Sequence, residues 1–237
     1  MGNTSSFVKD STHFINEIKD LNLDANDILV SFDVQSLYTN VPLDEAMEVI
    51  HKIANSDTTK LIEVYLKSTF FSFRDEIYEH TCGVAMGSPL SRIIANLFME
   101  DFENKPIEST PLKSKLWKRF FNDTFIIWPH GKQKLKDFLQ HLNSLSNSIK
   151  VTMEIEENDN LRFLDILIKK KKYGSISHEV YCNKTHIEHY LHANSHHHPS
   201  QKSVVLNTLA TRVIRISDEN HFEDEKNHLM NVFTKNG

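Results

Sequence analysis

The chain has 237 residues, of which 39% are hydrophobic and 25% charged, with six glycines and six prolines. This composition excludes a disordered chain and suits one large domain or two small ones. A net charge of -5 gives no global sign of nucleic-acid binding, and no apolar run reaches the roughly 20 residues needed to cross a bilayer. Two cysteines, 100 residues apart, exclude a disulfide scaffold and a Cys-based zinc site, so an intracellular, reducing compartment is the simplest interpretation.

The first half of the chain alternates helical and strand patterns. Apolar residues at helical spacing predict a helix within 7–20, and the β-branched run over 28–34 predicts a buried strand. A helix that begins at a proline is expected over 42–54. A β-hairpin turning at an Arg-Asp pair is expected over 69–80, and a long helix over 88–102.

The second half continues with a hairpin over 116–128, two apolar arms around the polar pair Asn122-Asp123. An amphipathic helix, three strands and a helical tail beyond residue 200 follow, at 132–149, 151–157, 163–170 and 176–182. This order of elements predicts an α+β fold with a mostly antiparallel sheet.

Charge is unevenly distributed along the chain. Residues 1–104 hold 7 Lys or Arg against 17 Asp or Glu, whereas residues 105–237 hold 20 against 15. Two stretches are strongly basic, 105–136 with 8 basic and 2 acidic residues and 161–172 with 5 and 1. An acidic region followed by basic stretches suits a metal site that handles phosphates, although charge alone does not establish one.

Two aspartates occupy positions that suit chemistry. Asp33 ends the buried strand, an expensive place for a carboxylate, although it could simply cap the following turn. Asp123 lies at the predicted hairpin tip, where Asn-Asp pairs are common for backbone reasons. A strand-end Asp beside a hairpin Asp is nevertheless the arrangement of two-metal phosphoryl transfer, in which carboxylates of neighbouring strands share two Mg²⁺ ions.

Five blocks of the sequence resemble, in order, successive motifs of Penelope-like reverse transcriptases, the retroelement polymerases related to telomerase. They are SFDVQSLYTNVPLDEA, GVAMGSPLSRIIANLFMEDFE, WKRFFNDTFIIWPHG, LRFLDILIKKK and VYCNKTHIEHYLHANSHHHPSQK. The resemblance implies a polymerase palm over 1–178, an antiparallel sheet backed by helices, and a primer-grip region with a partial helical thumb over 179–237. It also implies an RNA template, a DNA primer and a deoxynucleoside triphosphate (dNTP) as partners, Mg²⁺ as the cofactor, no membrane association, and a nuclear location.

The resemblance assigns roles to individual residues. Asp33 and Asp123 match the metal-binding catalytic carboxylates, and Asn122 takes the place of the first Asp in the Tyr-x-Asp-Asp hairpin. The residues expected to contact the nucleotide are Val34 through its carbonyl, Tyr38 as the steric gate that rejects a 2′-hydroxyl, the loop residues Gly87, Ser88 and Pro89, and Lys169.

Several of these positions also have plain structural interpretations. Tyr38 could be core packing, Gly87 a turn before a helix, and Lys169 part of a solvated strand end. The histidines between 189 and 198 could suggest zinc, but without a defined His pair on a helix a structural or backbone-contacting role is preferred.

The chain departs from the family pattern at the residues that matter most. An amide oxygen at Asn122 can contact Mg²⁺ but brings no negative charge, which could reduce the rate on the order of 10³-fold or more. Arg92 stands where the family has Pro, and His80 where it usually has Gln. We also expect the fingers, which would precede residue 5, to be largely missing, and no nuclease domain in this chain.

Two functional hypotheses therefore remain. In the first, the chain is a reverse transcriptase domain that performs template-directed DNA synthesis with impaired activity. In the second, it is a catalytically inactive, polymerase-like remnant that binds nucleic acid through the basic stretches 105–136 and 161–172, or that has no selected role.

Overall fold

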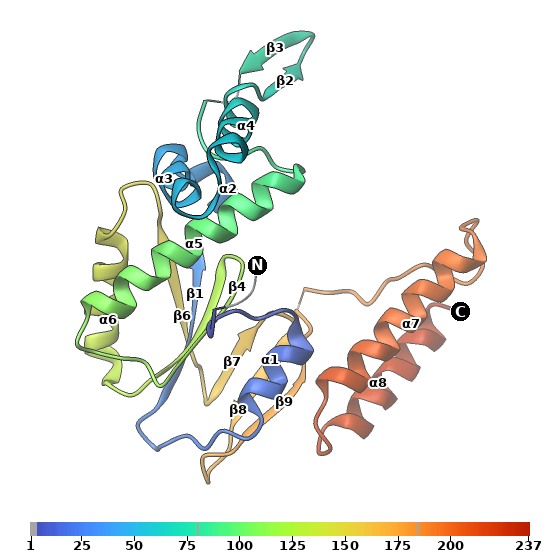
Figure 1. The fold of residues 1–237 in the computed structure, drawn as a ribbon. Coiled ribbons are helices and arrows are strands. Elements are labelled where there is room, and N and C mark those ends of the chain that lie inside the picture. Colours follow the sequence, from blue (N-terminus) through green and yellow to red (C-terminus); the bar gives the residue numbers. More distant parts are fainter. Residues whose placement is uncertain (1–3, 80, 184) are drawn as a thin grey trace.

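The computed structural model describes residues 4–79, 81–183 and 185–237 (Figure 1), so His80 lies outside the described residues. The helices are α1 (Ser11–Ile18), α2 (Leu37–Asn40), α3 (Leu43–Ile53), α4 (Ser56–Lys67), α5 (Pro89–Ser109), α6 (Gly131–Ser144), α7 (Pro199–Ile216) and α8 (Phe222–Lys235). The strands are β1 (Ile28–Val34), β2 (Phe70–Phe73), β3 (Glu76–Glu79), β4 (Leu116–Phe120), β5 (Asp123–Trp128), β6 (Val151–Ile155), β7 (Asn160–Phe163), β8 (Ile166–Lys170) and β9 (Ile176–Val180). Within the described part of the chain, none of the helices is long and apolar enough to cross a membrane.

The centre of the molecule is a four-stranded antiparallel sheet in the order β4-β5-β1-β6. The strand predicted over 28–34 and the hairpin predicted over 116–128 are both confirmed and lie side by side in it. The α+β fold with a mostly antiparallel sheet is likewise confirmed. Helices α5 and α6 cover one face of this sheet, and α1 lies with a second, smaller sheet on the other side (Figure 1).

Side chains of β1 alternate between two hydrophobic cores because successive residues of a strand point to opposite faces. Ile28, Val30 and Phe32 pack with α3, α5 and α6 in the first core. Leu29 belongs to the second core, where it joins Phe14 of α1 and residues of the smaller sheet. The same alternation directs Ser31 and Asp33 to the face of Leu29, beyond the apolar part of that face.

The smaller sheet has the order β7-β8-β9 and corrects one prediction. The segment 163–170 is not a single strand, because Leu164 adopts a positive φ of 55° and the chain turns between β7 and β8. The next turn lies at Gly174, whose φ is 82°. Helix α1 lies within the predicted segment 7–20, and the side chain of Asp10 caps it by accepting a hydrogen bond from the His13 backbone N–H.

A helical region with a projecting hairpin lies above the sheet (Figure 1). The hairpin β2–β3 turns at Arg74 and Asp75, as predicted, both with positive φ. Helix α4 was not predicted, and most of its residues are exposed. Gly83 has a φ of 68°, and a Cβ there would lie 2.4 Å from the Tyr38 carbonyl oxygen, so the chain after the hairpin passes too close to α2 for any side chain.

The C-terminal helices α7 and α8 form a pair that follows a stretch without regular secondary structure (Figure 1). Val213 and Ile216 anchor α7 in the second core. Arg212 adds a polar attachment, since its Nη2 donates to the Tyr181 carbonyl at 2.8 Å and its Nε lies 3.1 Å from Asp165. The helical prediction beyond residue 200 is therefore confirmed, with the break at residues 217–221.

Candidate active site

Asp33 and Asp123 are direct partners across the β1–β5 ladder, and Thr152 is the partner of Asp33 on β6. Directly opposed residues of an antiparallel pair have Cβ atoms about 5 Å apart on the same face. The sequence prediction that these two aspartates come together is therefore confirmed by the register. The predicted location of Asp123 needs a correction: it is the first residue of β5, and the hairpin turn consists of Phe121 and Asn122.

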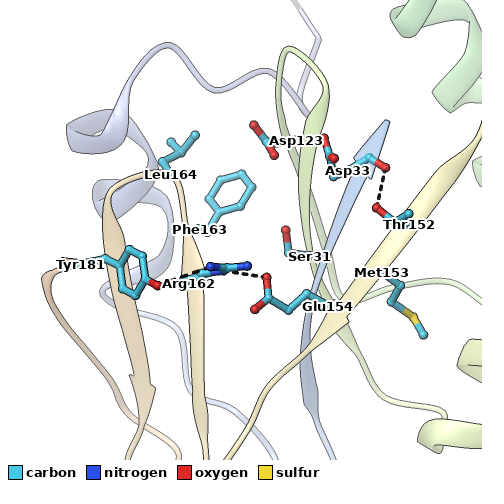
Figure 2. Close-up of a pocket in the computed structure, with 10 residues that line it drawn as sticks. All are labelled: Ser31, Asp33, Asp123, Thr152, Met153, Glu154, Arg162, Phe163, Leu164 and Tyr181. Carbon is cyan, nitrogen blue, oxygen red and sulfur yellow. Dashed lines mark hydrogen bonds and ion pairs between the residues drawn. The ribbon is translucent and has the colours of Figure 1, made fainter. Parts of the chain in front are cut away.

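The two carboxylates line a pocket of about 520 Å³ between the main sheet and the smaller one. Figure 2 shows both carboxylates at one end of this pocket. The lining residues are Ser31, Asp33, Asp123, Thr152, Met153, Glu154, Arg162, Phe163, Leu164 and Tyr181. Leu29 and Phe125, on the same face of the main sheet, are covered by apolar residues of α1 and the smaller sheet. The end of that face that carries Asp33 and Asp123 lies beyond these apolar residues, so its polar side chains are accessible to solvent or a ligand.

Asp123 has a pKa raised from 3.8 to about 6. Burial in the pocket wall is the larger cause, because it disfavours the charged form, and the neighbouring charge of Asp33 is the second. Like charges placed directly opposite one another on a sheet destabilise it. The pair is thus an electrostatically costly arrangement that a bound cation would relieve.

Asn122 completes the carboxylate end of the pocket. Its Nδ2 donates a 2.7 Å hydrogen bond to Oδ1 of Asp33, and its carbonyl oxygen accepts from the Val34 N–H at 3.2 Å. The Asp33 side chain therefore binds the hairpin turn across the sheet. Among the described residues it accepts no hydrogen bond from the turn after β1, so it does not cap that turn. An Asp at position 122 would place a third negative charge where the amide now donates a proton.

The hairpin turn is strained and held by a buried arginine. Phe121 has a φ of 53°, which is uncommon for a residue with a bulky side chain. Arg119 is fully buried, and its Nη1 donates to the Phe121 carbonyl at 3.0 Å and to Asn96 of α5 at 2.9 Å. Its Nε donates to the buried Glu103 at 2.9 Å. This network was not predicted from the sequence, because Arg119 follows Lys118 and Glu103 lies in a mostly polar run, so neither charge stands out from its neighbours.

A second polar group lies further along the pocket (Figure 2). Arg162 of β7 donates to Glu154 of β6 at 2.9 Å and lies 3.4 Å from the Tyr181 hydroxyl. These residues, too, were not predicted from the sequence. They connect the two sheets and place a cation in the same pocket as the two aspartates.

The other predicted nucleotide contacts lie outside the pocket lining. Val34 is buried in the first core, and Tyr38 is half-buried against that core, with its carbonyl accepting from the Val84 N–H at 2.6 Å. Lys169 lies on β8, where its Nζ is 2.6 Å from Glu179 and 3.4 Å from His221. The nucleotide-binding roles of these residues remain predictions.

In the loop before α5, Gly87 has free space around it, and the Ser88 side chain accepts two hydrogen bonds. Gly87 has a φ of 89° with no atom within 4 Å of a Cβ added there, which leaves room for a ligand to approach the backbone. Ser88 caps α5 by accepting from the Leu90 N–H, and it also accepts a 2.5 Å hydrogen bond from the Tyr65 hydroxyl. Pro89 is the first residue of the helix, a favoured position for proline.

The donor set fits a divalent cation through Asp33 and Asp123, because hard cations prefer carboxylate oxygens and two carboxylates lie directly opposite one another here. The fit is incomplete at Asn122, whose amide nitrogen faces Asp33. In residues 4–79, 81–183 and 185–237, no group of three or more His, Cys, Asp or Glu side chains is arranged to hold a metal, and this includes the described histidines between 189 and 198.

Comparison with known proteins gives two family matches. The family model described as reverse transcriptase (RNA-dependent DNA polymerase) matches residues 3–158, and that of the animal helix-turn-helix domain matches residues 189–237. No curated protein sequence matches the chain.

Solved structures of similar fold include telomerases. Telomerase from Candida albicans, in complex with a TWJ fragment of telomeric RNA, has a TM-score of 0.60 at 11% identity over 88% of this chain. Apo telomerase from Candida tropicalis has a TM-score of 0.59 at 10% identity over 97%. The chain spans 39% and 46% of the length of these two proteins. At such identity the likeness establishes the fold alone, and it agrees with the family match over two thirds of the sequence. The chain belongs to the reverse transcriptase family.

Proposed function

We propose that this chain performs template-directed DNA synthesis as a Penelope-like reverse transcriptase, using an RNA template, a DNA primer and a dNTP. The observation that carries the proposal is the opposition of Asp33 and Asp123 across the β1–β5 ladder, at one end of a pocket, in a chain of the reverse transcriptase family. The similarity of the five sequence motifs supports the Penelope-like subtype.

Asp33 and Asp123 are the residues that would hold Mg²⁺. When bound there, the metal lowers the pKa of the attacking hydroxyl and offsets the charge of the leaving phosphate oxygens. The protein itself supplies the alignment: the strand register fixes the two carboxylates on one face, and the Arg119 network fixes the hairpin turn that precedes Asp123. Only the deprotonated carboxylate would bind a cation, so the raised pKa of Asp123 opposes metal binding in acidic solution.

Asn122 is expected to impair this activity. Its amide brings no charge to the cation, and its hydrogen bond to Oδ1 of Asp33 engages an oxygen that a cation would otherwise use. The protein must break this bond or bind metal through the remaining oxygens. Each 1.4 kcal/mol lost in the transition state reduces the rate tenfold, so a loss of several kcal/mol corresponds to about 10³-fold.

The proposed polymerase subdomains follow one another along the chain. Residues 1–178 contain the main sheet, the β2–β3 hairpin and the smaller sheet as far as the middle of β9, and would form the palm, with the fingers largely missing. Residues 179–237 contain the end of β9, the irregular stretch and α7–α8, and would form the primer-grip region and a partial thumb. The attachment of Arg212 to the Tyr181 carbonyl fixes α7 close to a residue that lines the pocket.

A second candidate is a catalytically inactive domain that binds nucleic acid. The specific observation in its favour is the same Asn122–Asp33 hydrogen bond, which stabilises the carboxylate end of the pocket without metal. The two candidates differ in one measurable property, because only the first incorporates nucleotides.

The experiment is primer extension on an RNA template with Mg²⁺ and, separately, Mn²⁺. Four proteins are compared: the natural chain, Asn122→Asp, Asp33→Asn, and the exposed-residue control Asp137→Asn on α6. The polymerase proposal expects Asn122→Asp to raise incorporation, Asp33→Asn to abolish it, and Asp137→Asn to leave it unchanged. Retained RNA–DNA hybrid binding without incorporation by any variant would support the binding domain instead.

A further inference from the structure

Arg92 is an exposed arginine beside the catalytic hairpin. It lies in the first turns of α5, and its guanidinium carbon is 4.2 Å from the centre of the Phe121 ring. Among the residues that the structure describes, no carboxylate lies within ion-pair distance of Arg92, whereas Arg119, Arg162 and Arg212 each have an acidic partner. Its charge is therefore not neutralised within the described part of the protein.

Phe121 is a rigid platform for this cation. Its carbonyl accepts the hydrogen bond from the buried Arg119, and its ring contacts Phe120 edge to face, with 4.8 Å between the ring centres. The next residue, Asn122, binds Asp33. The position of the Arg92 guanidinium is thus coupled, through the hairpin turn, to the position of the carboxylate pair.

We propose that Arg92 binds a backbone phosphate of a nucleic acid that crosses the hairpin turn. A guanidinium stacked on an aromatic ring keeps its N–H edge free, and that edge matches two phosphate oxygens at once. The N-terminal end of the 21-residue helix α5 adds a favourable dipole for an anion. The phosphate's nucleic-acid origin rests on the proposed function, but the contact itself needs neither metal nor synthesis.

The charge pattern of the site supports this assignment. Arg92 places a positive charge beside the turn, and Asn122 at the turn is neutral, so it adds no negative charge there. Both features favour the approach of a polyanion in the absence of divalent cations. The site would therefore hold nucleic acid by direct cation–phosphate contact.

The test is fluorescence anisotropy of a labelled RNA–DNA hybrid in EDTA, without dNTP, at several salt concentrations. Arg92→Gln removes the charge and keeps a good helix former on an exposed position. Arg92→Lys keeps the charge. The matched control is Arg74→Asn on the distant β2–β3 hairpin, where Arg74 also lies over an aromatic ring, Phe73, and where Asn tolerates the positive φ.

We expect Arg92→Gln to weaken binding about 3- to 10-fold and to lower the slope of log K against log salt by about 1, the signature of one lost phosphate contact. Arg92→Lys should keep the slope, and Arg74→Asn should keep both slope and affinity. An unchanged slope in Arg92→Gln, an equal loss in Arg74→Asn, or no binding by the natural chain would each overturn the inference. Because this assay contains no metal, a failure of primer extension does not affect it.

Discussion

Asn122, in the hairpin turn just before Asp123, donates a 2.7 Å hydrogen bond through Nδ2 to Oδ1 of Asp33, the residue that faces Asp123 across the sheet. The neutral amide partly compensates the negative charge of Asp33, because it donates a hydrogen bond to a carboxylate that faces a second carboxylate. The fold is thereby stabilised in the absence of metal. The same bond opposes metal binding, so stability and catalysis depend on residue 122 in opposite directions.

The first prediction concerns this opposition. Asn122→Asp replaces a hydrogen-bond donor by a third carboxylate, and we expect the metal-free variant to be about 1–3 kcal/mol less stable, a loss of roughly 2–10 °C in Tm. Mg²⁺ or Mn²⁺ should restore most of the loss in Asn122→Asp and raise the Tm of the natural chain less. Differential scanning calorimetry with EDTA and with each metal measures both. A variant as stable as the natural chain in EDTA would show that the hydrogen bond contributes nothing.

The second prediction is a pH dependence. Because the pKa of Asp123 is about 6 in the folded protein and 3.8 ordinarily, the folded state holds the proton more tightly, so this residue's contribution to stability falls as pH rises from about 4 to 6. Partial exposure limits the cost above pH 6 to about 1–2 kcal/mol.

Asp123→Asn removes that cost. Its Tm should exceed that of the natural chain by about 2–8 °C at pH 8 and match it near pH 4. Thermal melts from pH 4 to pH 8 provide the comparison, with Asp137→Asn on the exposed side of α6 as the control. A gain in Tm that is constant over this pH range would contradict the electrostatic cause.

The third prediction concerns Arg119. Arg119→Met leaves the buried carboxylate of Glu103 without its guanidinium partner and frees the Phe121 carbonyl, which should cost about 3–5 kcal/mol. The exposed pair Arg162–Glu154 is the control, and Arg162→Met should cost less than about 1 kcal/mol. Urea denaturation of the two variants gives the free energies of unfolding. Equal losses would mean that burial of the Arg119 network does not matter.

The fourth prediction compares two glycines with positive φ. Gly83→Ala places a Cβ 2.4 Å from the Tyr38 carbonyl oxygen and 2.5 Å from that of Thr39, so backbone must move, and we expect a loss of more than 2 kcal/mol. Gly87→Ala meets no atom within 4 Å and should cost only about 1 kcal/mol for its φ. Urea denaturation separates the two. The reverse order of stability would contradict the close approach of residue 83 to α2.

Much of the fold was predictable because strong local patterns determine it. The apolar run of β1 and the two arms of β4–β5 form strands of the central sheet, as their sequences predict, and the outer hairpin turns at Arg74 and Asp75 as predicted. Asp33 and Asp123 could be paired in advance because the sequence places one at the end of a buried strand and the other in a neighbouring hairpin. The register that makes them direct partners came only with the structure.

The parts that could not be predicted depend on tertiary contacts. Helix α4 has few buried residues and so gives a weak periodic signal. Leu164 interrupts the segment 163–170 because its φ is positive, and leucine gives no sequence signal for that backbone conformation. Arg119 is buried in β4, and its partners on α5, Glu103 and Asn96, are 16 and 23 residues away in sequence.

The most direct test of the central claim is primer extension by Asn122→Asp beside the natural chain, on an RNA template with Mn²⁺. The account predicts weak or undetectable incorporation by the natural chain and an increase on the order of 10³-fold in the variant, lost again in Asn122→Asp combined with Asp33→Asn. A folded Asn122→Asp variant that binds the RNA–DNA hybrid and incorporates nothing would contradict it.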